Sequence, residues 1–287
     1  MKLAIIVVLY NKAIKNSTTI KSLSNLENNE FSVLLFNNGP LLINADEEDK
    51  VLLNKFENIE IVQDPNNRPL SIIYNDFIQN VKADSYLILD DDSYVDNSLI
   101  LKYMSADLSL DLHVPVIKSK SNGDVFYPVY NNEVVKDSTV LDFDDSFRTI
   151  GSGTLISKCL IDKFSVFQSE IFDTRFSLYG VDFSLFRRMT LLIKNQTKFK
   201  IAVVGELEHS LSKVDVVGDL MENDERYIAM FLGQLLYEKH GIKKERFVLG
   251  ELLKYLKKMN FKRCFLILNL FLLRAHKRSI KYKKKMK

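Results

Sequence analysis

The sequence predicts a mixed α/β fold built on a mostly parallel, doubly wound sheet flanked by helices. Apolar runs rich in β-branched residues alternate with segments whose apolar side chains recur at helical spacing, a pattern typical of such sheets. The 287 residues are 46% hydrophobic and 11% aromatic, which is enough to bury a core and excludes wholesale disorder. No apolar run approaches the roughly 18 residues that a membrane-spanning helix needs.

The first third of the chain supplies this alternation. Leu3 to Leu9 is a continuous apolar run typical of a strand that is buried on both faces. Residues 16–18 offer a helix N-cap, and Ile20, Leu23 and Leu26 follow at helical spacing. Further strands are predicted over residues 31–36, 59–62 and 86–89, with a helix over 70–81 between the last two. After Pro128 the chain has no proline and the pattern is more mixed.

Two features bear on the cellular compartment. Only seven apolar residues follow Met1 and Lys2, which is too short for a signal peptide. The two cysteines, Cys159 and Cys264, cannot form a disulfide framework, which fits a reducing compartment. We therefore expect a cytoplasmic protein.

Charge divides the chain into two parts. The formal net charge is +3, yet residues 241–287 hold 16 Lys and Arg against Glu245 and Glu251, a local net of +14. Residues 1–240 hold 24 basic and 35 acidic residues, a net of −11. The break near Gly241 predicts a main domain over 1–240 and a basic, amphipathic helical tail over 241–287.

The tail carries an apolar stretch from Phe265 to Leu273 between basic residues. It is too short to span a bilayer but suits an interfacial helix, so we expect residues 261–287 to meet an anionic membrane surface. The alternative is a helix that packs on the main domain or on a second subunit, in a homo-oligomer. Nucleic acid is disfavoured because the body is acidic and only Tyr282 interrupts the basic end.

Polar clusters follow three of the predicted strands. They are Tyr10-Asn11, Asn37-Asn38 and Asp90-Asp91-Asp92. Ligands of doubly wound sheets bind beyond the carboxyl ends of the strands, so the three clusters together predict a binding site at that edge.

The three consecutive aspartates repel one another unless a positive charge offsets them. Asp90 and Asp92 are suited to hold Mg²⁺ or Mn²⁺ through carboxylate oxygens. One alternative is an acidic turn in which Asp92 or Ser93 caps a helix over residues 95–103. Another is a phosphatase of the haloacid dehalogenase type with Asp90 as nucleophile, although Tyr94 and the late position of the strand depart from that pattern.

Segments spread over residues 3–230 carry a more specific signal through their order and spacing. They are 7–11, 34–39, the pair Asn67 and Asn75, 87–93, 151–157, 172–188 and the histidine segment 207–212. Together they resemble the family 2 glycosyltransferases of the GT-A fold, closest to their rhamnosyltransferase-like bacterial branch.

This resemblance implies a GT-A catalytic domain over 1–240, with a nucleotide-binding half (1–95) and an acceptor-side half (96–240). It implies transfer of a sugar from a nucleotide-diphosphate donor to a glycan or lipid-linked saccharide in bacterial surface polysaccharide synthesis, at the inner face of the cell membrane. The implied metal ligands are Asp90, Asp92 and His209, and the implied base of an inverting displacement is Asp182. The implied nucleotide-sugar contacts are Tyr10, Asn11, Asn37, Asn67, Asn75, Asp90 and Asp91.

Several positions depart from the family pattern. Asn37 stands where relatives usually have Asp, Pro69 stands where Gly is usual, and Val181 replaces a common Glu. The alternatives that remain are a non-catalytic homologue that binds glycan or a partner transferase, a surface position for His209, and an N-cap role for Asp182 on a helix that begins near Phe183.

Overall fold

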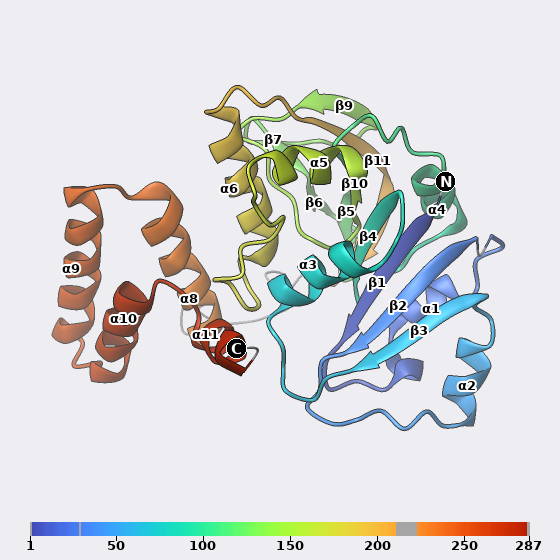
Figure 1. Cartoon of the computed structure of the whole chain (residues 1–287), viewed down its shortest axis with the longest axis horizontal. Coiled ribbons are helices and arrows are strands. Elements are labelled where there is room, and N and C mark those ends of the chain that lie inside the picture. The colour runs from blue at the N-terminus through green and yellow to red at the C-terminus, as the bar shows by residue number, and fades with distance from the viewer. Residues whose placement is uncertain (1, 29, 211–222, 286–287) are drawn as a thin grey trace.

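A computed structural model describes residues 2–28, 30–210 and 223–285 (Figure 1). Its main sheet follows the order β3-β2-β1-β4-β10-β5-β11-β9, and β6 pairs with β5. The strands are β1 (Leu3–Leu9), β2 (Phe31–Asn37), β3 (Asn58–Gln63), β4 (Ser85–Asp90), β5 (Leu112–Ser119), β6 (Val125–Tyr127), β9 (Thr139–Asp142), β10 (Thr154–Ser157) and β11 (Lys200–His209). Two short strands, β7 (Val129–Tyr130) and β8 (Glu133–Val134), pair apart from it.

Strand direction brings the predicted clusters to one edge. β1 pairs in parallel with β2 and β4, β2 with β3, and β5 with β11. β10 is antiparallel to both β4 and β5, and Thr154 at its start lies opposite Ile88 near the end of β4. The loop that precedes β10 is therefore placed beside the aspartates that follow β4.

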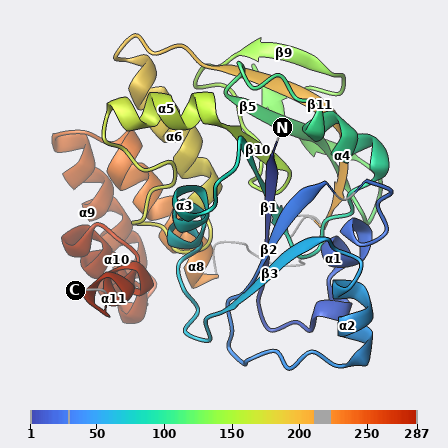
Figure 2. The same ribbon diagram turned by 45° about the vertical axis from the view of Figure 1, so that its right-hand side comes forward.

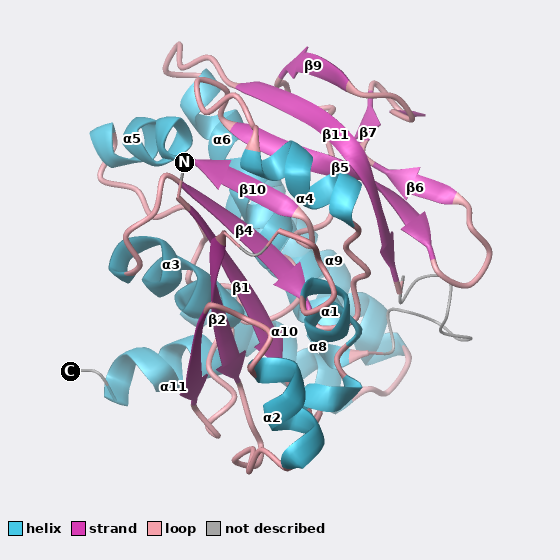
Figure 3. Ribbon diagram, turned by 90° about the vertical axis from the view of Figure 1, so that its right-hand side faces the viewer, coloured by secondary structure: helices cyan, strands magenta, loops and turns pink. Residues whose placement is uncertain are grey.

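Helices cover both faces of this sheet (Figure 3). Because strand side chains alternate, Ile5 and Val7 pack toward α1 and α4, while Ala4 and Ile6 pack toward α3, α5 and α6. These helices are α1 (Thr18–Leu23), α3 (Leu70–Asn80), α4 (Asn97–Met104), α5 (Lys158–Val166) and α6 (Val181–Ile193). The predicted doubly wound α/β sheet is confirmed.

One local expectation needs correction, and one helix was not foreseen. The helix predicted over residues 95–103 begins at Asn97, and Asp96 caps it through Leu99 rather than Asp92 or Ser93. Helix α2 (Glu47–Leu53) was not predicted; Asp46 and Asp49 begin it with a reciprocal capping box. A 3-10 turn, η1 (Ile14–Asn16), precedes α1, and Ser17 caps α1 as expected.

The C-terminal helices gather on the side of α6, away from α1 and α2 (Figures 1 and 2). They are α8 (Asp224–Gly233), which continues into a π-helical turn η2 (Gln234–Glu238), then α9 (Ile242–Lys257), α10 (Phe261–Leu273) and α11 (Lys277–Lys285). Val248, Tyr255, Cys264 and Ile267 of α9 and α10 are buried in the same core as the α3–α5–α6 face. Among the described residues, no helix is both long and apolar enough to cross a membrane.

Helix α11 turns back onto the main domain. Arg278 donates to Asn67 Oδ1 at 2.6 Å and to Glu225 at 2.9 Å, and the Ser279 hydroxyl lies 2.8 Å from that of Ser177. The described part of the segment predicted to meet a membrane therefore holds two different helices: α10, which has exposed apolar side chains, and α11, which packs on protein.

Candidate active site

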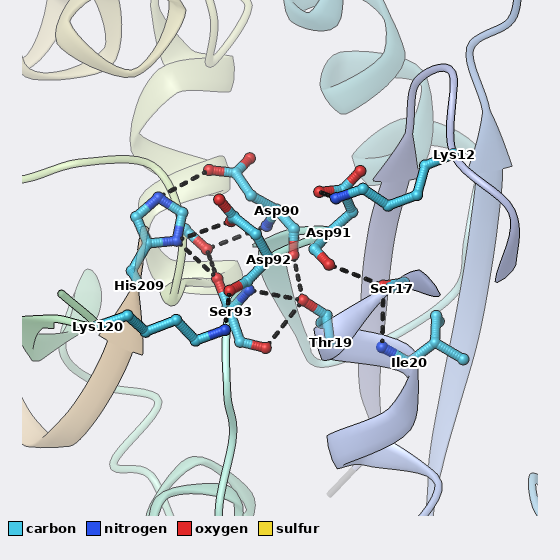
Figure 4. Close-up of polar contacts among 11 residues, drawn as sticks. Lys12, Ser17, Thr19, Ile20, Asp90, Asp91, Asp92, Ser93, Lys120 and His209 are labelled. Atoms are coloured by element: carbon cyan, nitrogen blue, oxygen red, sulfur yellow. Dashed lines mark hydrogen bonds and ion pairs between the residues drawn. The ribbon is translucent and has the colours of Figure 1, made fainter. Parts of the chain in front are cut away.

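Asp90, Asp92 and His209 converge where β4 and β11 end (Figure 4). His209 Nε2 lies 3.6 Å from Asp90 Oδ2, and His209 Nδ1 lies 3.0 Å from Asp92 Oδ1. The turn after β4 runs along the end of β11, where the Tyr94 amide donates to the Glu208 carbonyl at 2.9 Å. The two carboxylates and the imidazole that the sequence predicted as one site are thus brought together by neighbouring chain segments.

Hydroxyl groups hold the acidic turn in place. Thr19 Oγ1 donates to the Asp90 carbonyl at 2.5 Å and accepts from the Ser93 amide at 2.9 Å. The Ser152 hydroxyl accepts from the Asp90 amide at 3.0 Å and lies 2.7 Å from the Ser93 hydroxyl. Ser93 Oγ in turn lies 3.0 Å from His209 Nδ1. This network orders the backbone of the turn and leaves the carboxylates of Asp90 and Asp92 directed at one space.

The electrostatics of the cluster favour an added positive charge. Partial burial, reinforced by the charges of Asp92 and Asp182 and opposed by that of His209, raises the pKa of Asp90 above its usual range. Burial alone would lower the pKa of His209, but its contact with Asp92 and the charge of Asp90 outweigh burial, and the net shift is upward. For Asp92, burial works upward, while His209 and Lys12 outweigh it and lower the pKa. Asp90 and His209 therefore hold a proton more readily than separate side chains would, whereas Asp92 favours the ionised form that can ligate a cation.

The same cluster fits a divalent cation. One ligand atom from each of Asp90, Asp92 and His209 lies within 4.8 Å of the others. Asp92 Oδ1 is buried and makes no aligned hydrogen bond, so it has acceptor capacity to spare. Asp90 keeps 46% of its side chain exposed, which leaves it open to a ligand arriving from solvent. Two carboxylate oxygens and one imidazole nitrogen suit Mn²⁺ well and Mg²⁺ adequately.

Two lysines add positive charge around the aspartates. Lys12 Nζ lies 2.5 Å from Asp91 Oδ1, and Lys120 Nζ donates to the Asp92 carbonyl at 2.8 Å. Burial raises the pKa of Asp91, and the Lys12 ammonium opposes that rise without cancelling it. A bound polyanion such as a diphosphate would meet both ammonium groups next to the metal ligands.

Asp182 lies in the first turn of α6, and its carboxylate is held by backbone amides. It accepts from the Gly151 amide at 3.2 Å and from the Phe183 amide at 3.0 Å. The helix begins at Val181 with Gly180 at the N-cap position. Asp182 is therefore not the N-cap, as one of the alternatives from the sequence had it. Gly180 has φ +83°, and a side chain there would also meet the Phe176 ring at 2.9 Å, so this sharp entry into α6 requires glycine. Gly151, whose amide bonds Asp182, directly precedes Ser152, whose hydroxyl bonds the Asp90 amide, so the loop before β10 links the candidate base to the candidate metal site.

The predicted nucleotide contacts fall into two groups. Tyr10 is 49% exposed at the end of β1, and Asn11 follows it with φ +50° and its amide bonded to the Gly39 carbonyl. Asn37 is 1% exposed, and its side chain bonds Gln63, the Leu41 carbonyl and the Gly39 amide. Tyr10 is thus available to a ligand, whereas Asn37 shapes the loop beside it.

The side chains of Asn67 and Asn75 are both engaged by other parts of the chain. Asn67 Oδ1 accepts from Arg278 of α11. Asn75 is 4% exposed and makes reciprocal hydrogen bonds of 2.8 and 3.0 Å with the backbone of Phe172. The nitrogen and the oxygen of the Asn75 side-chain amide are therefore both used to join α3 to the segment that leads into α6.

No family model matches the chain, and no curated protein matches its sequence. Solved structures of TarS from S. aureus match its fold. The UDP complex of TarS residues 1–349 aligns with a TM-score of 0.55 at 14% identity, covering 85% of this chain and 68% of that one. The UDP-GlcNAc complex aligns at 0.52 and 14% identity, covering 96% and 72%. A longer TarS chain aligns at 0.55 and 15% identity, and the match covers 43% of its length.

These alignments and the sheet described above show a GT-A-like fold, as the sequence resemblance implied. They do not distinguish a rhamnosyltransferase-like branch from others. The last two residues of the predicted histidine segment, 211 and 212, lie outside the described residues.

Sequence reasoning missed the residues that support the acidic turn. Thr19 and Ser152 are both small polar residues far from Asp90 in the chain. Thr19 belongs to none of the segments that carried the resemblance, and Ser152 lies in one of them, 151–157, without a role having been assigned to it. Lys12 and Lys120 were also overlooked. For Lys12 a signal existed, because it directly follows the strand-end pair Tyr10-Asn11.

Proposed function

We propose that this protein is a glycosyltransferase that moves a sugar from a nucleotide-diphosphate donor to a glycan or lipid-linked saccharide in bacterial surface polysaccharide synthesis. The observation that carries the proposal is the cluster of Asp90, Asp92 and His209 at the carboxyl edge of a GT-A-like sheet. Structures with UDP and UDP-GlcNAc bound to TarS support a nucleotide-sugar donor for a chain of this fold. A lipid-linked acceptor would place the reaction at the inner face of the cell membrane.

In this proposal Asp90, Asp92 and His209 hold Mg²⁺ or Mn²⁺. When bound, the ion supplies Lewis-acid stabilisation of the leaving diphosphate. Lys12 and Lys120 add fixed positive charge to the same region, and Thr19 keeps the ligand-bearing turn in its geometry. The negative charges of Asp90 and Asp92, which would attract the ion, also raise the pKa of His209.

Asp182 is the proposed general base of a single inverting displacement. It takes the proton of the acceptor hydroxyl as that oxygen attacks the anomeric carbon, and the bond from that carbon to the diphosphate breaks. The Gly151 and Phe183 amides fix the carboxylate without neutralising it.

For the nucleotide, Tyr10 offers an exposed ring and Asn11 and Asp91 offer polar groups at the strand ends. Asn37, Asn67 and Asn75 contribute by holding the loops and α3 against which the donor lies.

The test is donor turnover. Purified protein is incubated with a panel of nucleotide-diphosphate sugars and Mn²⁺, with and without saccharide acceptors, and release of nucleoside diphosphate is measured for the wild type and for Asp92→Asn. The proposal expects release from at least one donor, a gain with acceptor, and its loss in Asp92→Asn. Binding of donor without turnover would identify a non-catalytic homologue, and release of inorganic phosphate from phosphate esters would identify a phosphatase.

A further inference from the structure

Helix α10 presents two apolar faces, and only one is buried. Cys264, Ile267 and Leu270 point into the core. Phe261, Phe265, Leu268 and Leu272 recur at helical spacing on another face and are 60, 69, 45 and 75% exposed. Scattered exposed apolar residues are ordinary, but four large ones in one stripe mark an interaction surface.

Helix α9, which packs against α10, carries a second stripe of the same kind. Val248 and Tyr255 of α9 are buried, while Leu249, Leu253 and Leu256 are 57, 49 and 44% exposed. The turn between the two helices adds Met259, which is 71% exposed. We call the α9 and α10 stripes together the hairpin face. Its residues are separate from those that hold α9 and α10 on the protein, so folding leaves the hairpin face uncovered.

Cations accompany the hairpin face. Across the described residues no ion pair engages Lys243, Lys244, Arg246, Lys257, Lys258 or Arg274. Arg246 and Lys257 lie four residues beyond Ile242 and Leu253, so each adjoins an exposed apolar side chain on the surface of α9. By contrast, Arg278 and Lys283 of α11 bond Glu225 and Thr174 of the body.

We propose that the hairpin face binds the surface of a bilayer containing anionic lipid, with the apolar side chains at the headgroup boundary and the free lysines and arginines on lipid phosphates. A helix of 13 residues is about 20 Å long, shorter than the ~30 Å hydrocarbon core, so α10 lies in the interface instead of crossing it. A second copy is a poor occupant, because a two-fold interface would bring together two hairpins whose residues 241–274 each hold nine Lys and Arg against Glu245 and Glu251, a net of +7. The proposed membrane contact is made by α9 and α10 and not by α11. It does not depend on the proposed enzymatic activity.

The chain contains no tryptophan, so one introduced tryptophan reports on its own surroundings. Phe265→Trp places the probe on the hairpin face, and Phe167→Trp places the control at the residue that follows α5, where the native phenylalanine is 39% exposed. With vesicles of phosphatidylcholine and phosphatidylglycerol, the emission of Phe265→Trp should shift to shorter wavelength and that of Phe167→Trp should not. Equal shifts, or none in either, would overturn the proposal.

Vesicle flotation of full-length protein provides the second measurement. Phe265→Ser/Leu272→Ser should reduce vesicle binding at least about tenfold, whereas Val166→Ser, at a site 78% exposed on α5, should not. Binding should weaken between ~0.1 M and ~1 M salt, as the Debye length falls from ~10 Å to ~3 Å, and on vesicles of phosphatidylcholine alone.

Unchanged flotation of the double variant would contradict the proposal. So would an oligomer of the wild-type chain, seen by light scattering without lipid, that the double variant dissociates, because the occupant would then be a second copy. Circular dichroism of each variant confirms that the comparison is between folded proteins.

Discussion

Substitution of Asp182 by Asn separates the proposed base from the proposed metal site. The amide keeps the size of the carboxylate and can still accept from the Phe183 amide, so the fold should lose no more than about 1 kcal/mol. It cannot take a proton from an acceptor hydroxyl. Loss of a placed base typically lowers kcat by ~10²-fold or more, or about 2.7 kcal/mol of barrier.

The effect on the metal site should be much smaller. The charge of Asp182 reaches Asp90, where it helps to raise the pKa, so its removal should weaken Mn²⁺ binding slightly. In a partly hydrated site this coupling is below about 1 kcal/mol, less than about fivefold in affinity. Donor affinity should therefore stay near that of the wild type while kcat collapses.

The assay is steady-state transfer with a saccharide acceptor, together with calorimetric titration of donor into protein with Mn²⁺. Asp162→Asn, an exposed carboxylate on α5, is the matched control and should leave both unchanged. An equal loss of donor affinity and turnover in Asp182→Asn would move this residue into the nucleotide site. Full turnover would show that the base lies elsewhere.

Three further substitutions probe groups around the site. Thr19→Val removes the hydroxyl that holds the Asp90–Ser93 turn, so it should weaken Mn²⁺ affinity by about tenfold with little change in melting temperature. A Mn²⁺ affinity equal to that of the wild type would contradict this supporting role. Asn75→Ala leaves the Phe172 backbone unpaired and should lower the free energy of unfolding, measured in urea, by about 2–4 kcal/mol; unchanged stability with lost donor binding would return Asn75 to the donor site. Burial works to raise the pKa of Asp173, but the hydrogen bonds from Arg175 outweigh it and lower that pKa. A carboxyl whose pKa is lower in the folded state stabilises the fold at every pH above its unfolded pKa, near 4, and this stabilisation is lost as the pH falls through the folded pKa. Asp173→Asn should therefore lower the free energy of unfolding by about 2 kcal/mol at neutral pH and by progressively less in acid. A loss of stability that does not change with pH would contradict this assignment.

The central strands β1 and β4 were predictable because strands that are buried on both faces have unbroken apolar runs in their sequence. Leu3–Leu9 is such a run, and so is the stretch 86–89 within β4. The metal cluster was predictable in part for a related reason, since parallel strands deliver their carboxyl ends to one edge. Helix α2 escaped because it lies on the surface with one buried residue, Asp49, and so lacks an apolar stripe.

Long-range side-chain contacts were beyond sequence reasoning. Asn75 looked like a donor ligand from its spacing, but its amide is used on the backbone of Phe172, 97 residues away. The sequence of the tail shows only that it is basic. In the structure Arg278 donates to Asn67 and Glu225, whereas no ion pair among the described residues engages Lys257. The charge pattern predicts that the basic residues of 241–287 need anionic or polar partners. It does not predict which of them find those partners within the chain.

The central claim is that Asp90, Asp92 and His209 hold the divalent cation to which a nucleotide diphosphate binds. Titration of Mn²⁺ followed by electron paramagnetic resonance measures it directly, with and without nucleoside diphosphates, for the wild type and Asp92→Asn. We predict one Mn²⁺ site whose affinity rises when a diphosphate is present and is largely lost in Asp92→Asn, with the variant still folded. Equal Mn²⁺ binding by both proteins, or no effect of any nucleoside diphosphate, would contradict the account.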